Sequence, residues 1–199
     1  MWAIVTDNTI TKTFNNPRGL IIDNIQYSRN IFSFRWSNEE REAIGIYEVV
    51  FDNTNKKDEE YYTNTNQSFA FADGVVTASY GSATAKAHAD RNAVDEDGDE
   101  LDPVVVIPGL KTKLIRTLKS QAASILAQTD WYIVRKADAG TSVPSAITTH
   151  RAAVRTKCAA METAITNASN TVAIETLYTH TIDEDGVSSR PLGELPEAV

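Results

Sequence analysis

The chain has 199 residues, of which 42% are hydrophobic and 23% charged, and its formal net charge is −8. This composition is typical of a soluble globular protein of one ordinary or two small domains. The acidic balance argues against a general nucleic-acid binder, and the longest apolar runs are far shorter than the roughly 20 residues of a membrane helix. The N-terminal residues lack a signal-peptide pattern. The single cysteine, Cys158, excludes an internal disulfide.

The first 81 residues predict a β-rich domain with several hairpins. Asp7-Asn8 separates two short apolar stretches and is a plausible tight turn. A second turn over residues 15–19 leads into a strand at Leu20–Ile22. Asp73-Gly74 is a strong two-residue turn signal between two arms rich in β-forming residues. We therefore expect antiparallel pairs at both ends of this domain.

One short helix is expected inside the β-rich domain. Ser37 and Glu40 have the spacing of a capping box, in which each side chain bonds the other residue's amide. Gly45 suits the left-handed conformation that commonly ends a helix. The sequence therefore predicts a helix over residues 38–44, followed by a strand over residues 46–51.

Residues 82–109 predict an acidic linker region. Its first part, SATAKAHADRNA, is rich in alanine and could form a short helix. Six acidic residues then fall within residues 95–102, which indicates an exposed loop. We place the domain boundary in this region.

Residues 110–182 predict a helical domain, which makes the chain an α+β protein: a β-rich N-terminal domain with hairpins and one short helix, followed by a C-terminal helical hairpin region. Apolar residues recur at helical spacing over residues 110–128 and again over residues 144–167. Pro144 suits the first turn of the second helix. A shorter helix is expected over residues 170–178, and residues 183–199 predict an extended C-terminal tail that docks on a neighbour.

No catalytic or metal-binding pattern stands out. Asp95, Asp97 and Asp99 fit the first positions of a calcium loop, but glycine and glutamate are missing from the later ones. The three histidines lack zinc-site spacing, and no phosphate-binding or nucleophile motif occurs. Cys158 falls on the apolar stripe of its helix and fits a small core residue. The sequence predicts neither an enzyme nor a cofactor nor a metal site.

The charge is unevenly distributed along the chain. Residues 103–157 carry nine basic and two acidic side chains, a net +7. The preceding residues 81–102 carry −5 and the following residues 158–199 carry −6. A basic segment between acidic ones suggests contact with an acidic partner surface or within an oligomer. A solvated helix face balanced by acidic loops explains the pattern equally well.

The stretch QTDWYIVRKADAGTSVPSAITTHR, residues 128–151, is predicted to connect the two long helices. Asp130 is expected to shape the turn, and Trp131 is expected to pack between the helices rather than to serve as an exposed anchor. The basic side chains of this region are expected to face solvent or partner carboxylates. The candidate partner-binding residues are Trp131, Arg135, Lys136, Arg151 and Arg155.

This part of the chain resembles the tail-associated domain of many bacteriophage proteins, in which a "DW" turn after one helix is followed by "YRxxLR" on the next. Thr129-Asp130-Trp131 matches the turn, and residues 150–155 match the second motif with His150 for tyrosine and Val154 for leucine. The stretches RWSNEEREAIGIYEVV and VVFDNTNKKDEEYYTNTNQSFAFADGVVTASYG are similar to virion proteins of marine phages. The resemblance covers most of the chain and implies a phage tail or tail-fibre context.

The resemblance implies a structural component of a bacteriophage tail: a fibre, an adaptor or a protein at the baseplate periphery. Its partners would be other phage tail proteins, with several copies in the particle and no nucleic acid or membrane partner. It would be assembled in the host cytoplasm and reside in the virion. A tail-fibre assembly chaperone is the alternative, and a host-glycan receptor-binding protein is a further one.

Overall fold

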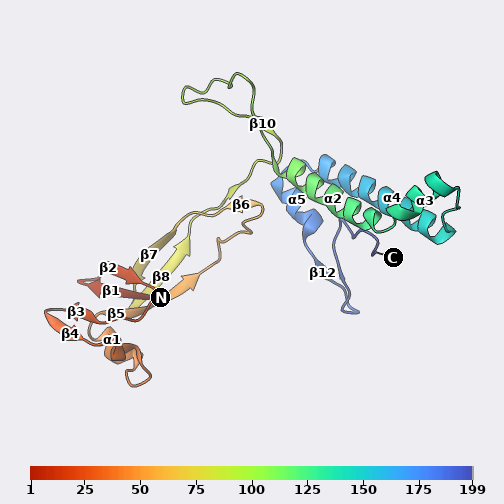
Figure 1. The fold of residues 1–199 in the computed structure, drawn as a ribbon. Helices are drawn as coiled ribbons and strands as arrows, with labels where there is room; N and C mark the ends of the chain where they lie inside the picture. The colour runs from red at the N-terminus through yellow and green to blue at the C-terminus, as the bar shows by residue number, and fades with distance from the viewer. Residues whose placement is uncertain (199) are drawn as a thin grey trace. The chain divides into compact units, whose positions relative to one another are not determined.

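The computed structural model describes residues 1–198 and confirms the α+β class. Helices account for 34% and strands for 25% of the chain, with the strands concentrated in the N-terminal part and the helices in the C-terminal half. The chain divides into two compact units, Met1–Thr84 and Ala85–Val199, which we call the N-terminal unit and the helical unit (Figure 1). No helix within residues 1–198 is both long and apolar enough to cross a bilayer.

A five-stranded sheet organises the N-terminal unit, in the order β2-β1-β5-β8-β7. Its two predicted hairpins are confirmed, and both residues of each turn, Asp7-Asn8 and Asp73-Gly74, have positive φ. The central strands β5 and β8 pair in parallel, which joins the two hairpins into one sheet. The strands are β1 (Trp2–Thr6), β2 (Thr9–Phe14), β5 (Ile46–Asp52), β7 (Gln67–Ala72) and β8 (Val75–Tyr80).

Smaller elements surround this sheet. The predicted strand at Leu20–Ile22, β3, pairs with β4 (Ile25–Tyr27) through a turn at Asp23-Asn24 that sequence analysis did not identify. A short 3₁₀ helix, η1 (Arg29–Phe32), follows. The pair β6 (Tyr62–Thr63) and β9 (Thr84–Ala85) lies where the unit ends.

Hydrophobic residues pack on both faces of the sheet. Strand β1 shows this alternation, because Ala3 and Val5 join one core cluster whereas Trp2 and Ile4 pack against the other. The first cluster contains residues of β5 and β8, and the second contains residues of β2, β3 and η1. The sheet is therefore the structural centre of this unit.

The predicted capping box forms at helix α1 (Asn38–Glu42). The Ser37 hydroxyl accepts a bond from the Glu40 amide at 3.2 Å, and the Glu40 carboxylate accepts one from the Ser37 amide at 2.8 Å. The helix is shorter than the predicted 38–44, because the chain turns out of it before Gly45, whose φ is +79°. A side chain there would place its Cβ 2.6 Å from the Val5 carbonyl oxygen, so the site requires glycine.

A buried arginine holds the segment between η1 and α1. One Arg41 guanidinium nitrogen, Nη1, donates to the carbonyl oxygens of Ile31 at 3.1 Å and Trp36 at 2.8 Å. The other, Nη2, donates to Asn38 Oδ1 at 2.6 Å, and the guanidinium lies 5.1 Å from the centre of the Trp2 ring. Arg41 is only 8% exposed, and carbonyl dipoles stabilise its charge.

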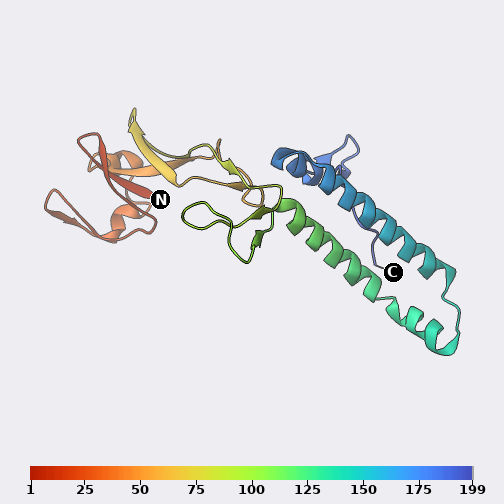
Figure 2. The ribbon, with the colours of Figure 1, turned by 90° about the horizontal axis from the view of Figure 1, so that it is seen from above.

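The helical unit is built on two long helices that lie side by side, as Figures 1 and 2 show for α2 and α4. The three predicted helices are confirmed to within a few residues, and a fourth, α3, occupies most of the predicted connector. Leu114, Leu118, Val154 and Ile165 are among the residues buried in this unit. The helices are α2 (Leu110–Ala127), α3 (Asp130–Ala139), α4 (Ser145–Asn167) and α5 (Thr171–Tyr178).

Two β-hairpins extend the helical unit. The first contains β10 (Arg91–Asn92) and β11 (Val106–Ile107), so the helix proposed over residues 82–93 is wrong; that segment forms strands and irregular chain. The second contains β12 (Thr181–Ile182) and β13 (Ser188–Ser189). The predicted extended tail therefore begins with a hairpin, and its final residue, Val199, lies outside the described residues.

Candidate functional site

A buried arginine clasp defines the end of the helical unit where α2, α3 and α4 meet. Arg151, on α4, donates through Nη1 to the carbonyl oxygen of Leu126 and to the hydroxyl of Thr129, both at 2.7 Å. Its Nη2 donates to Asp130 Oδ1 at 2.8 Å, which completes an ion pair. Arg151 is 6% exposed, so these bonds form away from bulk water on the arginine side.

The clasp stabilises the break between α2 and α3. The carbonyl groups in the last turn of a helix have no partner within it, and cations stabilise that end of the helix dipole. Arg151 provides both a donor and a positive charge at Leu126, in the last turn of α2. Asp130 is the first residue of α3, where a negative charge is favourable. One guanidinium thus joins the end of one helix to the start of the next.

Three residues of the motif on which the predicted resemblance rests contact one another in this clasp. Thr129 and Asp130 come from the "TDW" part, and Arg151 comes from the second part, 21 residues beyond Asp130. The prediction that Asp130 shapes the connection is consistent with its place at the start of α3. The motif therefore has a clear structural role in this chain, which is to fix the position of α3.

Beside the clasp, α3 carries a stacked cluster of two aromatic rings and one cation. The rings of Trp131 and Tyr132 have centroids 3.9 Å apart and are tilted by 31°. The Arg135 guanidinium lies 4.7 Å from the Trp131 centroid and 5.4 Å from that of Tyr132. Trp131, Val134 and Arg135 are three and four residues apart and so share one helix face. We call these three residues the tip surface.

The structure corrects the expected position of Trp131. It does not pack between α2 and α4; 51% of it is exposed, and α3 has no buried residue at all among residues 130–139. Val134 is 65% and Ile133 43% exposed. Because the stretch forms a separate helix rather than a turn, its apolar side chains project from that helix instead of pointing back between the long ones.

The five candidate residues do not form one basic face. Arg151 is buried in the clasp, so the prediction that it faces solvent or a partner is wrong. Arg155 is exposed on α4, where it lines a groove of about 280 Å³ together with Lys119 and Cys158. Trp131 and Arg135 do lie together, whereas Lys136 is exposed elsewhere on the turn of α3. Tyr132, three residues before Arg135, and Val134, three residues after Trp131, were missed, although this spacing would have identified them had the stretch been assigned as a helix.

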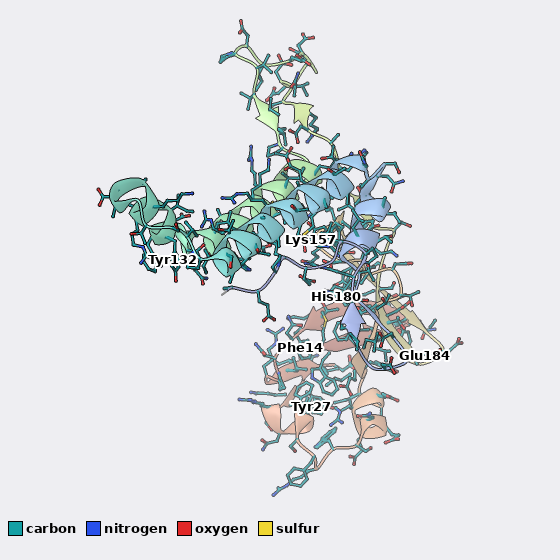
Figure 3. All side chains as sticks on the ribbon, turned by 90° about the vertical axis from the view of Figure 1, so that its right-hand side faces the viewer. Phe14, Tyr27, Tyr132, Lys157, His180 and Glu184 are labelled. Atoms are coloured by element: carbon teal, nitrogen blue, oxygen red, sulfur yellow. The ribbon has the colours of Figure 1, made fainter. Side chains whose placement is uncertain are left out.

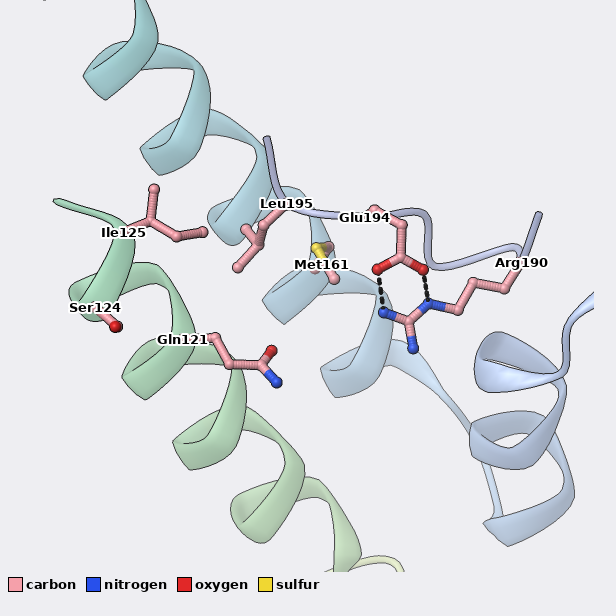
Figure 4. A pocket seen from close by; sticks show the side chains of 7 residues that line it. All are labelled: Gln121, Ser124, Ile125, Met161, Arg190, Glu194 and Leu195. Carbon is pink, nitrogen blue, oxygen red and sulfur yellow. Dashed lines mark hydrogen bonds and ion pairs between the residues drawn. The ribbon is translucent and has the colours of Figure 1, made fainter. Parts of the chain in front are cut away.

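The opposite side of α2 is covered by the C-terminal segment (Figure 4). Arg190 and Glu194 form a two-bond ion pair, with Nε–Oε1 at 2.6 Å and Nη2–Oε2 at 2.7 Å. Leu192 is 3% exposed, and its amide donates to the Leu177 carbonyl at 3.0 Å. The tail therefore contacts the helices of its own chain. In Figure 3, Tyr132 marks the α3 end of the unit and Lys157 a point along α4.

The site offers a contact surface. Among residues 1–198, no group of three or more histidine, cysteine, aspartate or glutamate side chains is placed to hold a metal ion. The nearest polar network is the clasp, in which Nη1 and Nη2 of Arg151 bond structural partners. What α3 presents to its surroundings is an ordered apolar and cationic face.

No protein-family model, curated protein or solved structure matches the chain.

Proposed function

We propose that the chain is a structural component of a bacteriophage tail (a fibre, an adaptor or a protein at the baseplate periphery) that acts through protein–protein contacts. The observation that carries the proposal is α3, an ordered helix without a single buried residue. Ordinary surface helices bury an apolar stripe against their own chain. An exposed helix held in place by a buried arginine is instead available to a partner.

The composition of α3 supports this role. Tryptophan, tyrosine and arginine are the residue types most enriched among the side chains that dominate binding at protein interfaces. Here Trp131 and Tyr132 are stacked with Arg135 before any partner binds. Such preorganisation reduces the entropy lost on association. The partner would be another phage tail protein, with the chain present in multiple copies.

The phage context is supported by the resemblance of residues 126–158 to tail-associated domains. Thr129, Asp130 and Arg151, which belong to the shared motif, are the residues that fix α3. A motif that positions an exposed helix fits a protein whose role is assembly.

The experiment is quantitative mass spectrometry of purified virions of the phage that encodes the chain. We expect the wild-type chain in stoichiometric amounts. Val134→Asp places a charge on the tip surface and should deplete the chain from particles at least about tenfold. Thr156→Asp adds the same charge at an exposed position of α4 and serves as the matched control.

Two measurements separate the alternatives: the content of mature particles and polysaccharide binding by the purified chain. A chain that is required for tail formation but missing from mature particles would identify an assembly chaperone and overturn the structural role. Specific binding of host polysaccharide by the purified chain, abolished by Trp131→Ala, would instead identify a receptor-binding protein.

A further inference from the structure

A second element of the helical unit is exposed on all sides: the hairpin of residues 90–108, which we call the arm. Its strands β10 and β11 pair with each other, and a bridge between Val94 and Glu100 continues the ladder. Two-stranded hairpins are marginally stable in water without a further layer. Six apolar side chains of the arm are between 36% and 58% exposed: Val94, Leu101, Val104, Val105, Val106 and Ile107.

The arm is also strongly acidic. Residues 95–102 contain six acidic side chains and no basic one. Within residues 1–198, none of these six carboxylates takes part in an ion pair. The arm therefore presents exposed apolar side chains beside a negative charge that no basic side chain of residues 1–198 pairs with.

The tip surface has the complementary chemistry. Its apolar side chains Trp131 and Val134 are exposed beside the cation of Arg135, and Lys136 follows on the same helix. In the described part of the chain, neither of these two cations is paired with a carboxylate. An apolar surface with positive charge matches an apolar surface with negative charge.

The arm and the tip surface of one chain lie at opposite ends of α2. The arm leads directly into the start of this helix, and α3 follows its end (Figures 1 and 2). Eighteen helical residues span about 27 Å. Asp90 fixes the root of the arm, because its Oδ1 accepts the Gly109 amide at 2.7 Å and its Oδ2 the Thr112 hydroxyl at 2.9 Å. From that root the arm points away from the helices in both views.

We infer that the arm of one copy docks on the tip surface of a second copy of this chain. The inference rests on the proposed assembly function and names the partner of α3. Contact between unlike surfaces of identical chains produces a ring when the rotation between copies closes, a filament when it does not, and a two-armed dimer when the contacts are reciprocal. In each case the exposed valines of the arm are buried against Trp131 and Val134.

Sedimentation velocity of the purified full chain tests the inference by charge exchange. Glu96→Lys, Asp97→Lys, Asp99→Lys and Asp102→Lys together change the net charge of residues 95–102 from −6 to +2. Arg135→Glu with Lys136→Glu reverses the charge of these two neighbouring cations of α3. Each of the two variants alone should associate at least about tenfold more weakly than the wild type. A mixture of the two variants should associate again, because a positive arm then meets a negative α3 and a negative arm meets a positive one. The chain carrying all six substitutions should also associate by itself.

The second hairpin provides a matched control. Asp183 Oδ1 accepts the amides of Asp185 and Val187, as Asp95 Oδ1 accepts those of Asp97 and Asp99, and a glycine with positive φ occupies the fourth position of both loops. Glu184→Lys with Asp185→Lys, in the loop marked by Glu184 in Figure 3, changes the net charge of residues 183–185 from −3 to +1 and so reverses its sign, as the arm variant does. It should leave association unchanged.

Three results would overturn the inference: a wild-type chain that stays monomeric up to about 100 μM at low salt, a variant mixture that stays dissociated, or a control that weakens association as much as the arm variant. Each is distinct from a failure of the proposed function. A chain that is stoichiometric in virions but monomeric in solution would retain the tail role and lose only the contact between copies.

Discussion

Both units contain a buried arginine that bonds main-chain carbonyl groups, yet the two arginines hold different kinds of structure. Arg41 fixes the segment before α1, and the neighbouring residues Ile31 and Trp36 belong to or pack against a hydrophobic core. Arg151 fixes α3, which has no core beneath it. In the N-terminal unit the arginine therefore serves the fold. In the helical unit it orders a surface that contributes little to the fold, which is why we assign that surface to assembly.

The largest effect on stability should come from Arg41. Arg41→Ala removes three hydrogen bonds, leaves buried carbonyl groups unpaired and removes the guanidinium that covers Trp2. We expect the free energy of unfolding of the N-terminal unit to fall by about 4 kcal/mol. Urea denaturation followed by the fluorescence of Trp2 and Trp36 measures it. Arg35→Ala, at an exposed position, should change it by less than about 0.5 kcal/mol.

Arg151→Ala should destabilise the helical unit by about 3 kcal/mol, because the Leu126 carbonyl and the Thr129 hydroxyl lose their charged donor. Asp130→Asn should have a smaller effect, since Arg151 keeps both of those bonds. Denaturation followed by Trp131 fluorescence measures both changes. Equal losses in the two variants would contradict the assignment of the main stabilisation to the carbonyl end of the clasp.

Trp131→Ala should separate stability from assembly. The side chain is half exposed and contributes mainly its contacts with Tyr132 and Arg135, so the free energy of unfolding should fall by about 1 kcal/mol or less. Circular dichroism should show an intact helical unit, while incorporation into particles is lost. If the variant unfolds the helical unit, Trp131 has a core role and the comparison between the two units fails.

The smallest effect is a pH dependence at the root of the arm. The Gly109 amide, the Thr112 hydroxyl and the charge of Arg116 hold the pKa of Asp90 below its usual range. Because the folded-state pKa is lower than the unfolded one, this stabilisation is present above about pH 4 and is lost as the pH falls through the folded-state value. In the wild type, the Gly109 amide should therefore lose protection from hydrogen exchange at acid pH. In Asp90→Asn the same amide should be less protected at all pH values.

Local sequence signals predicted much of the fold. The capping box of Ser37 and Glu40, the turn at Asp73-Gly74 and the left-handed Gly45 each depend on a few neighbouring residues, and all three form as expected. The parallel pairing of β5 with β8 depends on contacts between distant segments and has no local signal. The same holds for the arm, whose alanine-rich entry suggested a helix that does not form.

The candidate site was predicted only in part. The sequence predicts a connector over this stretch, because its Gly-Thr-Ser sequence marks a break in the chain. That break falls after Ala139 and leaves ten residues that form α3. This difference exposes Trp131. It also explains Arg151, whose burial depends on the end of α2 and the start of α3 lying within reach of α4. A charge count along the chain cannot distinguish such a buried cation from an exposed one.

Cross-linking from position 134 in assembled particles tests directly whether α3 contacts another tail chain. A photoreactive residue in place of Val134 lies on the tip surface, at a side chain that is 65% exposed in the free chain. Irradiated virions should contain an adduct between position 134 and another tail chain, and the expected partner is the arm of a second copy. A chain that is incorporated normally but yields no adduct from position 134 would contradict the assignment of α3 to assembly.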